Sequence, residues 1–498
     1  MVFSSSTFLF FFLPIVVAVS LVVPFKNLWL LIASLVFYLW GGGTFIFLLL
    51  TSIMVNWALG LAVGDAAYRP EDPGHGRLRR RICITLSVLV NVGLLAWFKY
   101  ANFAAAQIDA LVRAFDPAFE GLGIQDIVLP IGISFFTFQA MSYVLDVASG
   151  RARVLRNPID FALYVSLFPQ LIAGPIVRFH EIEQQLRDRS VTLDGFATGV
   201  NRFALGLVKK VVVADSVAVL ADAAFSGDGS LPVAGAWVGI LAYTIQIFFD
   251  FSGYTDMAIG MGQMLGFTFP ENFRRPYSAL SVTDFWRRWH MTLSHWFRDY
   301  VYIPLGGNRH GTFATYRNLA IVFLITGLWH GANWTFVVWG IYHGAWLIFE
   351  RVFGTGVSEE PDPLMRVIRR ATTLLIVMIG WVIFRADSIA EAGAYIGSLL
   401  GFGGRGIASE QLSPLTQALG YAVAEAVTPT AVLMLGVGMM TFFLPGDRAT
   451  GKALDPEPGF TAPVWAPGFR FALSVILLPW ALATVVSGTF SPFLYFRF

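Results

Sequence analysis

Long apolar runs recur along almost the whole chain, separated by short polar or Gly/Pro-rich stretches. After a first run that leads to Pro24, we expect apolar elements at about 28–40, 44–64, 82–98, 127–147, 158–176, 203–222, 233–249, 253–268, 318–334, 335–350, 371–385, 388–402, 430–444 and 470–490. A helix needs about 20 apolar residues to cross a bilayer. The longer runs therefore predict transmembrane helices, and the shorter ones predict re-entrant or tilted pieces covered by protein.

The first apolar run and the polar interruptions of the pattern predict how the chain is organised. The first run carries no early Lys or Arg and no small-residue cleavage site, so it predicts a retained span rather than a cleaved signal peptide. Polar or Gly/Pro-rich sequence predicts loops at 354–365, 403–414 and 446–468. We therefore expect residues 1–498 to form a single polytopic, all-α membrane domain.

Composition agrees with the pattern. Of the 498 residues, 56% are hydrophobic and 13% are charged, against roughly 25% charged in a soluble domain, which excludes a soluble globular enzyme. The net charge of +2 gives no global field that favours nucleic acid. The single cysteine, Cys83, excludes an internal disulfide and a cysteine-rich metal site.

Basic residues alternate between successive loops and predict an orientation. Lys26, Arg69 with Arg77–Arg81, and Arg151–Arg156 follow the first, third and fifth spans. The intervening loop at 101–126 is acidic. Because Lys and Arg in short loops are held on the cytoplasmic side, we expect the N-terminus to lie outside.

Residues 269–317 break the apolar pattern. Seven arginines oppose three acidic residues there, and aromatic side chains are interspersed among them. This mixture predicts an interfacial or re-entrant segment, or the mouth of a cavity.

Five of the seven histidines fall within 54 residues in or just after this segment: His290, His295, His310, His330 and His343. A zinc helix would need histidines four apart with acidic or thiol partners. His290 and His295 are five apart, so we expect no metal site. Acid–base chemistry fits better, because imidazole titrates near neutrality.

His330 is the strongest candidate for a general base, since it lies within an otherwise apolar span at 318–350. Gly327 and Gly331 would leave space beside its imidazole for a substrate. Asn333, three residues later, would share its helical face and orient the ring. The alternative is a histidine hydrogen-bonded between helices.

Weaker candidates lie on either side of His330. His343 is a support residue, with packing an equal alternative. Asp250 and Asp256 flank Gly253 in apolar sequence; they would hold arginines of the 269–317 segment in ion pairs or line a reaction cavity.

Motifs for a serine hydrolase, a P-loop pump or a nicotinamide enzyme are absent from the sequence. From the residues alone, a membrane-embedded transferase and a proton-coupled transporter remain equally supported.

Three motifs resemble the membrane-bound O-acyltransferase (MBOAT) family. They are Asp284-Phe-Trp-Arg-Arg-Trp-His290, the continuation from Ser294 to Arg309, and Leu328-Trp-His-Gly-Ala-Asn333. Within the family the chain is most similar to the branch that serves bacterial alginate O-acetylation, through Leu129–Phe138, Ala173–Arg178, Phe249–Gly260 and Pro492–Phe498.

The resemblance implies a ring of about 11 or more transmembrane helices, with re-entrant and interfacial helices around a central funnel. It implies catalytic roles for His330, at the reaction centre, and His290, nearer the cytoplasm. Arg287 and Arg288 would attract an anionic donor such as acetyl-CoA, because arginine binds phosphate through a planar fork. Ser294 and Asn333 are weaker candidates for hydrogen bonds to the thioester carbonyl or the histidines.

The implied function is transfer of acetyl from a cytoplasmic thioester to a hydroxyl acceptor, for O-acetylation of an exported polysaccharide, with alginate the first choice. No tightly bound cofactor is implied. The expected location is a bacterial inner membrane, and the expected partners are the lipid bilayer, the polysaccharide and a periplasmic or membrane-anchored acetyltransferase. The alternatives are a transporter of an acyl group or its carrier, a scaffold for a periplasmic acetyltransferase, cellulose or peptidoglycan acetylation, and teichoic acid D-alanylation.

Overall fold

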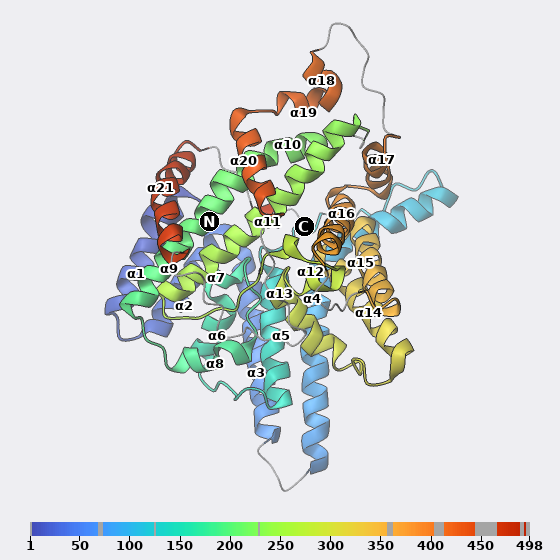
Figure 1. The fold of residues 1–498 in the computed structure, drawn as a ribbon. Helices are drawn as coiled ribbons and strands as arrows, with labels where there is room; N and C mark the ends of the chain where they lie inside the picture. Colours follow the sequence, from blue (N-terminus) through green and yellow to red (C-terminus); the bar gives the residue numbers. More distant parts are fainter. Residues whose placement is uncertain are drawn as a thin grey trace. The chain divides into compact units, whose positions relative to one another are not determined.

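The protein is described from a computed structural model, in which every regular element is a helix within the described residues 2–67, 73–123, 126–227, 230–355, 362–402, 413–443, 466–488 and 493–494 (Figure 1). Contacts divide the chain into two compact units. Unit 1 comprises Met1–Phe203 and Met257–Pro270, and unit 2 comprises Ala204–Asp256 and Glu271–Phe498. The all-α class is confirmed, and the single membrane domain stays a prediction.

Unit 1 is built around three mutually packed helices, α3, α4 and α5. Between α3 and α4 the Asn56 side-chain oxygen accepts hydrogen bonds from the Ser87 hydroxyl and the Asn91 amide, both at 2.8 Å. Such buried polar contacts hold apolar helices together. The helices of this unit are η1 (Phe8–Phe12), α1 (Leu13–Val22), α2 (Lys26–Gly42), η2 (Gly43–Phe45), α3 (Ile46–Ala67), α4 (Pro73–Phe115), α5 (Ile133–Ser149), α6 (Pro158–Ser166), α7 (Phe168–Leu171), α8 (Phe179–Arg187) and the first part of α9 (Leu193–Val208).

Helix α4 is longer than the apolar run predicted. It spans Pro73–Phe115, so Arg77–Arg81 and most of the acidic stretch after residue 101 are helical rather than loop. Arginine and alanine are strong helix formers. One helix therefore continues from the arginine-rich stretch through the apolar run at 82–98 and into the sequence after residue 101. Arg69 lies outside the described residues, and the orientation of the N-terminus stays a prediction.

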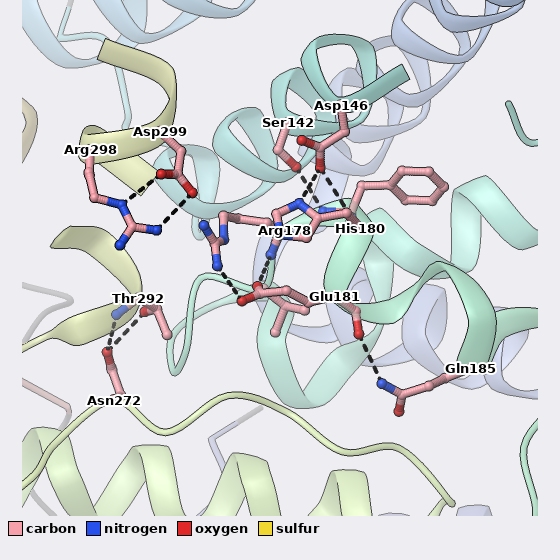
Figure 2. Close-up of polar contacts among 12 residues, drawn as sticks. Ser142, Asp146, Arg178, His180, Glu181, Gln185, Asn272, Thr292, Arg298 and Asp299 are labelled. Carbon is pink, nitrogen blue, oxygen red and sulfur yellow. Dashed lines mark hydrogen bonds and ion pairs between the residues drawn. The ribbon is translucent and has the colours of Figure 1, made fainter. Parts of the chain in front are cut away.

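Side chains close the N-terminus of α8, where the chain turns sharply. Figure 2 shows the buried Asp146 accepting hydrogen bonds from the backbone N–H and the Nδ1 of His180, at 3.1 and 2.9 Å. Glu181 accepts from the Arg178 backbone N–H at 2.8 Å and pairs with its guanidinium. These bonds satisfy donors that a helix start leaves open.

Unit 2 contains the remainder of the chain, including all of the predicted site residues. Its helices are the last part of α9, the π-helix η3 (Lys209–Ala214), α10 (Asp215–Ala224), most of α11 (Val233–Met264), η4 (Pro276–Ser278), α12 (Val282–Trp286), α13 (Met291–Phe297), η5 (Arg298–Tyr302), α14 (Gly311–His330), α15 (Trp334–Val352), α16 (Pro363–Arg385), α17 (Ile389–Leu399), α18 (Pro414–Leu419), α19 (Tyr421–Glu425), α20 (Pro429–Met440) and α21 (Ala466–Val486). The loop expected at 354–365 ends earlier, because α16 starts at Pro363. Residues 356–361, 403–412 and 446–465 of the expected loops lie outside the described residues.

The predicted runs 233–249 and 253–268 are not separate elements, because α11 continues through Gly253 to Met264. A Cβ at Gly253 would lie 2.7 Å from the Gly206 carbonyl oxygen and 3.0 Å from the Lys210 backbone nitrogen. Glycine therefore serves close packing against 204–210 rather than a break in the helix.

The short helix α12 depends on a carboxylate from α15. Glu350 accepts hydrogen bonds from the backbone N–H groups of Val282 and Thr283, at 2.5 and 2.8 Å, and from the Thr283 hydroxyl at 2.6 Å. A negative charge at a helix N-terminus is also favoured by the helix dipole. Glu350 thus fixes the start of the segment that carries Arg287, Arg288 and His290.

Five helical segments of the described chain are long and apolar enough to cross a membrane. They are Lys26–Gly64, Gly76–Phe115, Val233–Met264, Gly311–His330 and Pro363–Arg385. Shorter apolar helices add Phe8–Val22, Pro429–Met440 and Val475–Val486. A ring of 11 or more spans stays a prediction.

We expect Gly253→Ala to destabilise the protein by about 1–3 kcal/mol, because the new methyl group would overlap backbone atoms that cannot move aside cheaply. The melting temperature of the detergent-purified protein measures this. Gly436→Ala in α20 is the matched control, since no atom lies within 4 Å of its added Cβ; it should be neutral or slightly stabilising. Equal melting temperatures for the two variants would contradict the close-packing argument.

We expect Glu350→Ala to cost on the order of 3 kcal/mol, because three buried or half-buried donors at the start of α12 lose their acceptor. Melting temperature and protection of 282–290 from limited proteolysis should both fall. Glu391→Ala, which removes an acceptor for the exposed Asp387 N–H, is the control and should change both much less. An equal loss in both variants would show that Glu350 has no special role.

Candidate active site

The predicted base His330 is the last residue of α14, where this helix packs beside α15 (Figure 1). Its side chain is buried. The imidazole makes edge contacts with Trp339 and Phe384, with ring centroids 5.0 and 5.1 Å apart, and with Trp329 at 4.9 Å. The aromatic rings hold His330 in a narrow range of orientations.

The sequence predicted that the two glycines near His330 leave space for a substrate, and this prediction was wrong. An added Cβ at Gly327 would overlap the Phe336 carbonyl oxygen, and one at Gly331 would overlap the Phe336 ring. Gly340 on α15 is similarly close to the Phe323 carbonyl oxygen, at 2.5 Å. These glycines instead let α14 and α15 approach closely.

Asn333 does not share a helical face with His330, because α14 ends at His330 and Asn333 is the N-cap of α15. Its side-chain oxygen accepts a hydrogen bond from the Thr335 N–H at 3.1 Å. Its amide donates to the Asp387 carbonyl oxygen at 2.9 Å. The prediction of a shared face was wrong, since an extended backbone at Gly331 separates the two residues.

His290 lies between α12 and α13 and is buried. Its backbone has φ 45° and ψ 52°, in the left-handed region that residues other than glycine rarely adopt. Its ring contacts Phe251 edge-on, with centroids 4.8 Å apart. Burial lowers the pKa of His290 to about 3, so the imidazole is neutral at neutral pH.

Asn272 is the residue at this site that sequence reasoning missed. Its side-chain oxygen lies 3.1 Å from His290 Nδ1. The same oxygen accepts a hydrogen bond from the Thr292 hydroxyl at 2.9 Å (Figure 2). The sequence offers only a weak signal for it, an amide in the arginine-rich segment, because its partners lie 18 and 20 residues away.

Aromatic rings connect three of the histidines of unit 2, His290, His330 and His343. Trp329 lies 6.1 Å from His290 and 4.9 Å from His330, between ring centroids. Trp339 lies 5.0 Å from both His330 and His343. The structure therefore brings all three predicted histidines into one aromatic cluster.

His343 is fully buried in this cluster. Its ring packs edge-on against Trp286 at 5.0 Å, and a Cβ at Gly380 would lie 2.5 Å from its Nε2. A glycine on α16 thus makes the room that the imidazole occupies. This environment is consistent with the packing alternative for His343.

The two predicted donor-binding arginines have different environments. Arg287 is exposed. Arg288 is buried, and its Nε lies 2.8 Å from Asp284. Ser294 donates a hydrogen bond to the Trp286 carbonyl oxygen at 3.1 Å, which links α13 to α12.

Asp250 does not pair with an arginine of the 269–317 segment, so that alternative was wrong for this residue. It lies 2.8 Å from the Lys210 ammonium and accepts a hydrogen bond from the Leu494 N–H at 2.7 Å. Lys210 also pairs with Asp215 at 2.7 Å. A lysine from η3 takes the place expected for arginine because η3 packs directly against α11.

Asp256 pairs with Lys209, the residue next to Lys210, at 2.5 Å. Each lysine of η3 thus faces one carboxylate of α11, on either side of Gly253.

The C-terminal motif at 492–498 is described only at Phe493 and Leu494, and its other residues lie outside the described residues. Phe493 is buried and stacks on Tyr254, with centroids 4.5 Å apart. Within the described chain, no group of three His, Cys, Asp or Glu side chains is placed to hold a metal ion.

Comparisons with known proteins identify the family of the chain. The sequence model of the membrane-bound O-acyltransferase family matches residues 136–386, which include His290, His330 and His343. The chain is 42% identical to the "probable alginate O-acetylase AlgI" of Pseudomonas putida over the full length of both chains. It is 46% identical to the protein of that description in Pseudomonas aeruginosa, over 84% of this chain and 77% of the relative.

A more distant relative is described as acting on a different acceptor. The "peptidoglycan O-acetyltransferase" of Helicobacter pylori is 36% identical, over 81% of this chain and 80% of the relative. The family match covers the arginine and histidine motifs, and full-length similarity extends it to the rest of the sequence. The chain belongs to the membrane-bound O-acyltransferase family.

Proposed function

We propose that this acyltransferase passes acetyl from a cytoplasmic thioester donor to a hydroxyl acceptor, for O-acetylation of an exported polysaccharide. The observation that supports this most directly is the pair of buried histidines, His290 and His330, whose rings both contact Trp329. Ionisable side chains among apolar helices are costly and mark functional sites.

In the proposed reaction His330 acts as general base. It removes the proton from the acceptor hydroxyl, whose oxygen forms a bond to the acetyl carbonyl carbon. The carbon–sulfur bond then breaks, and the leaving thiolate takes the proton back from the imidazolium. No covalent enzyme intermediate is needed, and a base of this kind contributes about 10²–10⁴-fold in rate. Binding both substrates in one site adds acceleration through proximity.

Acetyl-CoA is the proposed donor, bound as a substrate rather than as a tight cofactor. Arg287 is exposed and therefore suited to contact its phosphate groups. Arg288 would add positive charge nearby, while its pairing with Asp284 keeps it fixed. Ser294, Asn333 and His343 would support the segment rather than react.

Alginate is the proposed polysaccharide, because relatives over the full length are described as alginate O-acetylases. The acetyl group would reach the glycan directly or by relay through a periplasmic or membrane-anchored acetyltransferase. We place the chain in a bacterial inner membrane, as the family resemblance implies, with the N-terminus outside, from the alternation of basic segments along the sequence. Peptidoglycan is the second candidate acceptor, supported by the Helicobacter pylori relative.

A transporter and a scaffold are the alternatives from other classes. A transferase should cleave acetyl-CoA in detergent when an acceptor is supplied. A transporter of an acyl group or carrier needs an intact membrane and leaves the thioester unbroken. A scaffold would keep polysaccharide acetylation when its histidine is removed.

We expect His330→Ala to lower acetyl transfer by about 10²–10⁴-fold, because the general base is lost. The measurement is the O-acetyl content of secreted polysaccharide from a deletion strain that expresses the variant at wild-type membrane abundance. His310→Ala is the matched control, since His310 is exposed at the start of α14; it should retain acetylation. Normal acetylation with His330→Ala would reject the proposed base.

We expect Arg287→Ala to raise the KM for acetyl-CoA several-fold with little change in kcat, because it removes a charge that attracts the donor without altering the base. The difference from wild type should shrink as salt is added. Arg309→Ala removes another exposed arginine of the same segment and should leave the KM near the wild-type value. An unchanged KM in Arg287→Ala would exclude Arg287 from donor binding.

A further inference from the structure

One asparagine binds three consecutive residues of the turn that carries His290. The backbone oxygen of Asn272 accepts a hydrogen bond from the Met291 N–H at 2.9 Å. Its side-chain oxygen lies 3.1 Å from His290 Nδ1 and accepts from the N–H and hydroxyl of Thr292, at 3.3 and 2.9 Å. Asn272 is itself fully buried. The turn around His290 is therefore held by one side chain and its own backbone.

These bonds determine which way the Asn272 amide faces. A backbone N–H can only donate, so the Asn272 atom that faces the Thr292 N–H must be the oxygen. The other end of the amide agrees, because its nitrogen donates to the Thr255 hydroxyl at 3.4 Å. The atom beside His290 Nδ1 is therefore an acceptor.

The amide orientation in turn determines the tautomer of His290. A neutral imidazole carries its proton on one nitrogen only, and the nitrogen that faces an acceptor is the protonated one. Nδ1 of His290 thus donates to Asn272, and Nε2 keeps its lone pair. A histidine in this state can accept a proton or hydrogen bond at Nε2 and cannot donate one from that atom.

The backbone at His290 also needs support. Left-handed backbone conformations cost about 1–3 kcal/mol for residues other than glycine and persist only where surrounding contacts hold them. The bonds from Asn272 to residues 291 and 292 supply such contacts, and Phe251 fixes the ring from another side. Tautomer and ring position are set together.

We propose that Asn272 is the positioning residue of His290, which it holds as the Nδ1–H tautomer so that Nε2 serves as a hydrogen-bond or proton acceptor for a bound substrate. This rests on the proposed function and on the catalytic role that the family resemblance implies for His290. It assigns His290 Nε2 the role of an acceptor, and it excludes that atom as a donor to the thioester oxygen in the resting enzyme.

The test is the ring ¹⁵N spectrum of histidine-labelled protein in liposomes, because protonated and unprotonated ring nitrogens have different chemical shifts. The His290 signals are identified by their loss in His290→Gln. In the wild-type protein we expect a protonated Nδ1 and an unprotonated Nε2. The opposite pattern in the wild type would overturn the proposal, whether or not any Asn272 variant folds.

Two substitutions at Asn272 separate positioning from folding. Asn272→Leu keeps the size and removes the acceptor, so we expect the Nε2–H tautomer to appear and kcat to fall about 10- to 100-fold, with KM nearly unchanged. Asn272→Asp keeps an acceptor oxygen and should preserve the Nδ1–H tautomer and restore most of kcat. Asn318→Leu is the control, because Asn318 is a buried amide that bonds the Leu305 and Gly307 carbonyl oxygens; it should leave the His290 spectrum unchanged.

The two readouts distinguish this proposal from the proposed function. An unchanged His290 tautomer in folded Asn272→Leu overturns the positioning role, whatever the activity. A changed tautomer with wild-type kcat supports the control of the tautomer by Asn272 and instead rejects the role of His290 in acyl transfer. A changed tautomer with reduced kcat, restored by Asn272→Asp, supports both.

Discussion

A buried polar group is costly unless it has a hydrogen-bond partner, so most buried polar groups are paired within the folded chain. Unit 2 meets this requirement at two points that define the site. Glu350 receives the open N–H groups of α12, and Asn272 receives the turn at 290–292. Since the intervening residues are few, these two side chains together place the arginine pair and His290. The site is thus built by polar contacts and enclosed by aromatic rings.

The apolar runs predicted the positions of most helices well, because hydrophobic length is a local property of the sequence. They did not predict how far helices continue into polar sequence. Helix α4 extends to Phe115 because its later residues favour helix. Helix α11 passes through Gly253, whose role depends on a backbone that lies next to it only in the folded chain.

The candidate histidines could be identified from sequence, because an ionisable residue in apolar surroundings stands out. Their supporting residues could not. Asn272 and Glu350 act over 18 and 68 residues of sequence separation, and neither differs locally from an ordinary polar residue. Gly327 was interpreted wrongly for the same reason: a missing side chain can admit either a substrate or a neighbouring helix, and only the packing of α15 decides.

The left-handed backbone at His290 limits which amino acids can occupy this position during evolution. Asparagine, aspartate and glycine tolerate that conformation, whereas β-branched residues do not. A lineage that lost the imidazole would therefore pass most easily to asparagine, which keeps both the turn and a polar side chain. The geometry of the main chain, independently of catalysis, narrows the paths along which related enzymes diverge at this site.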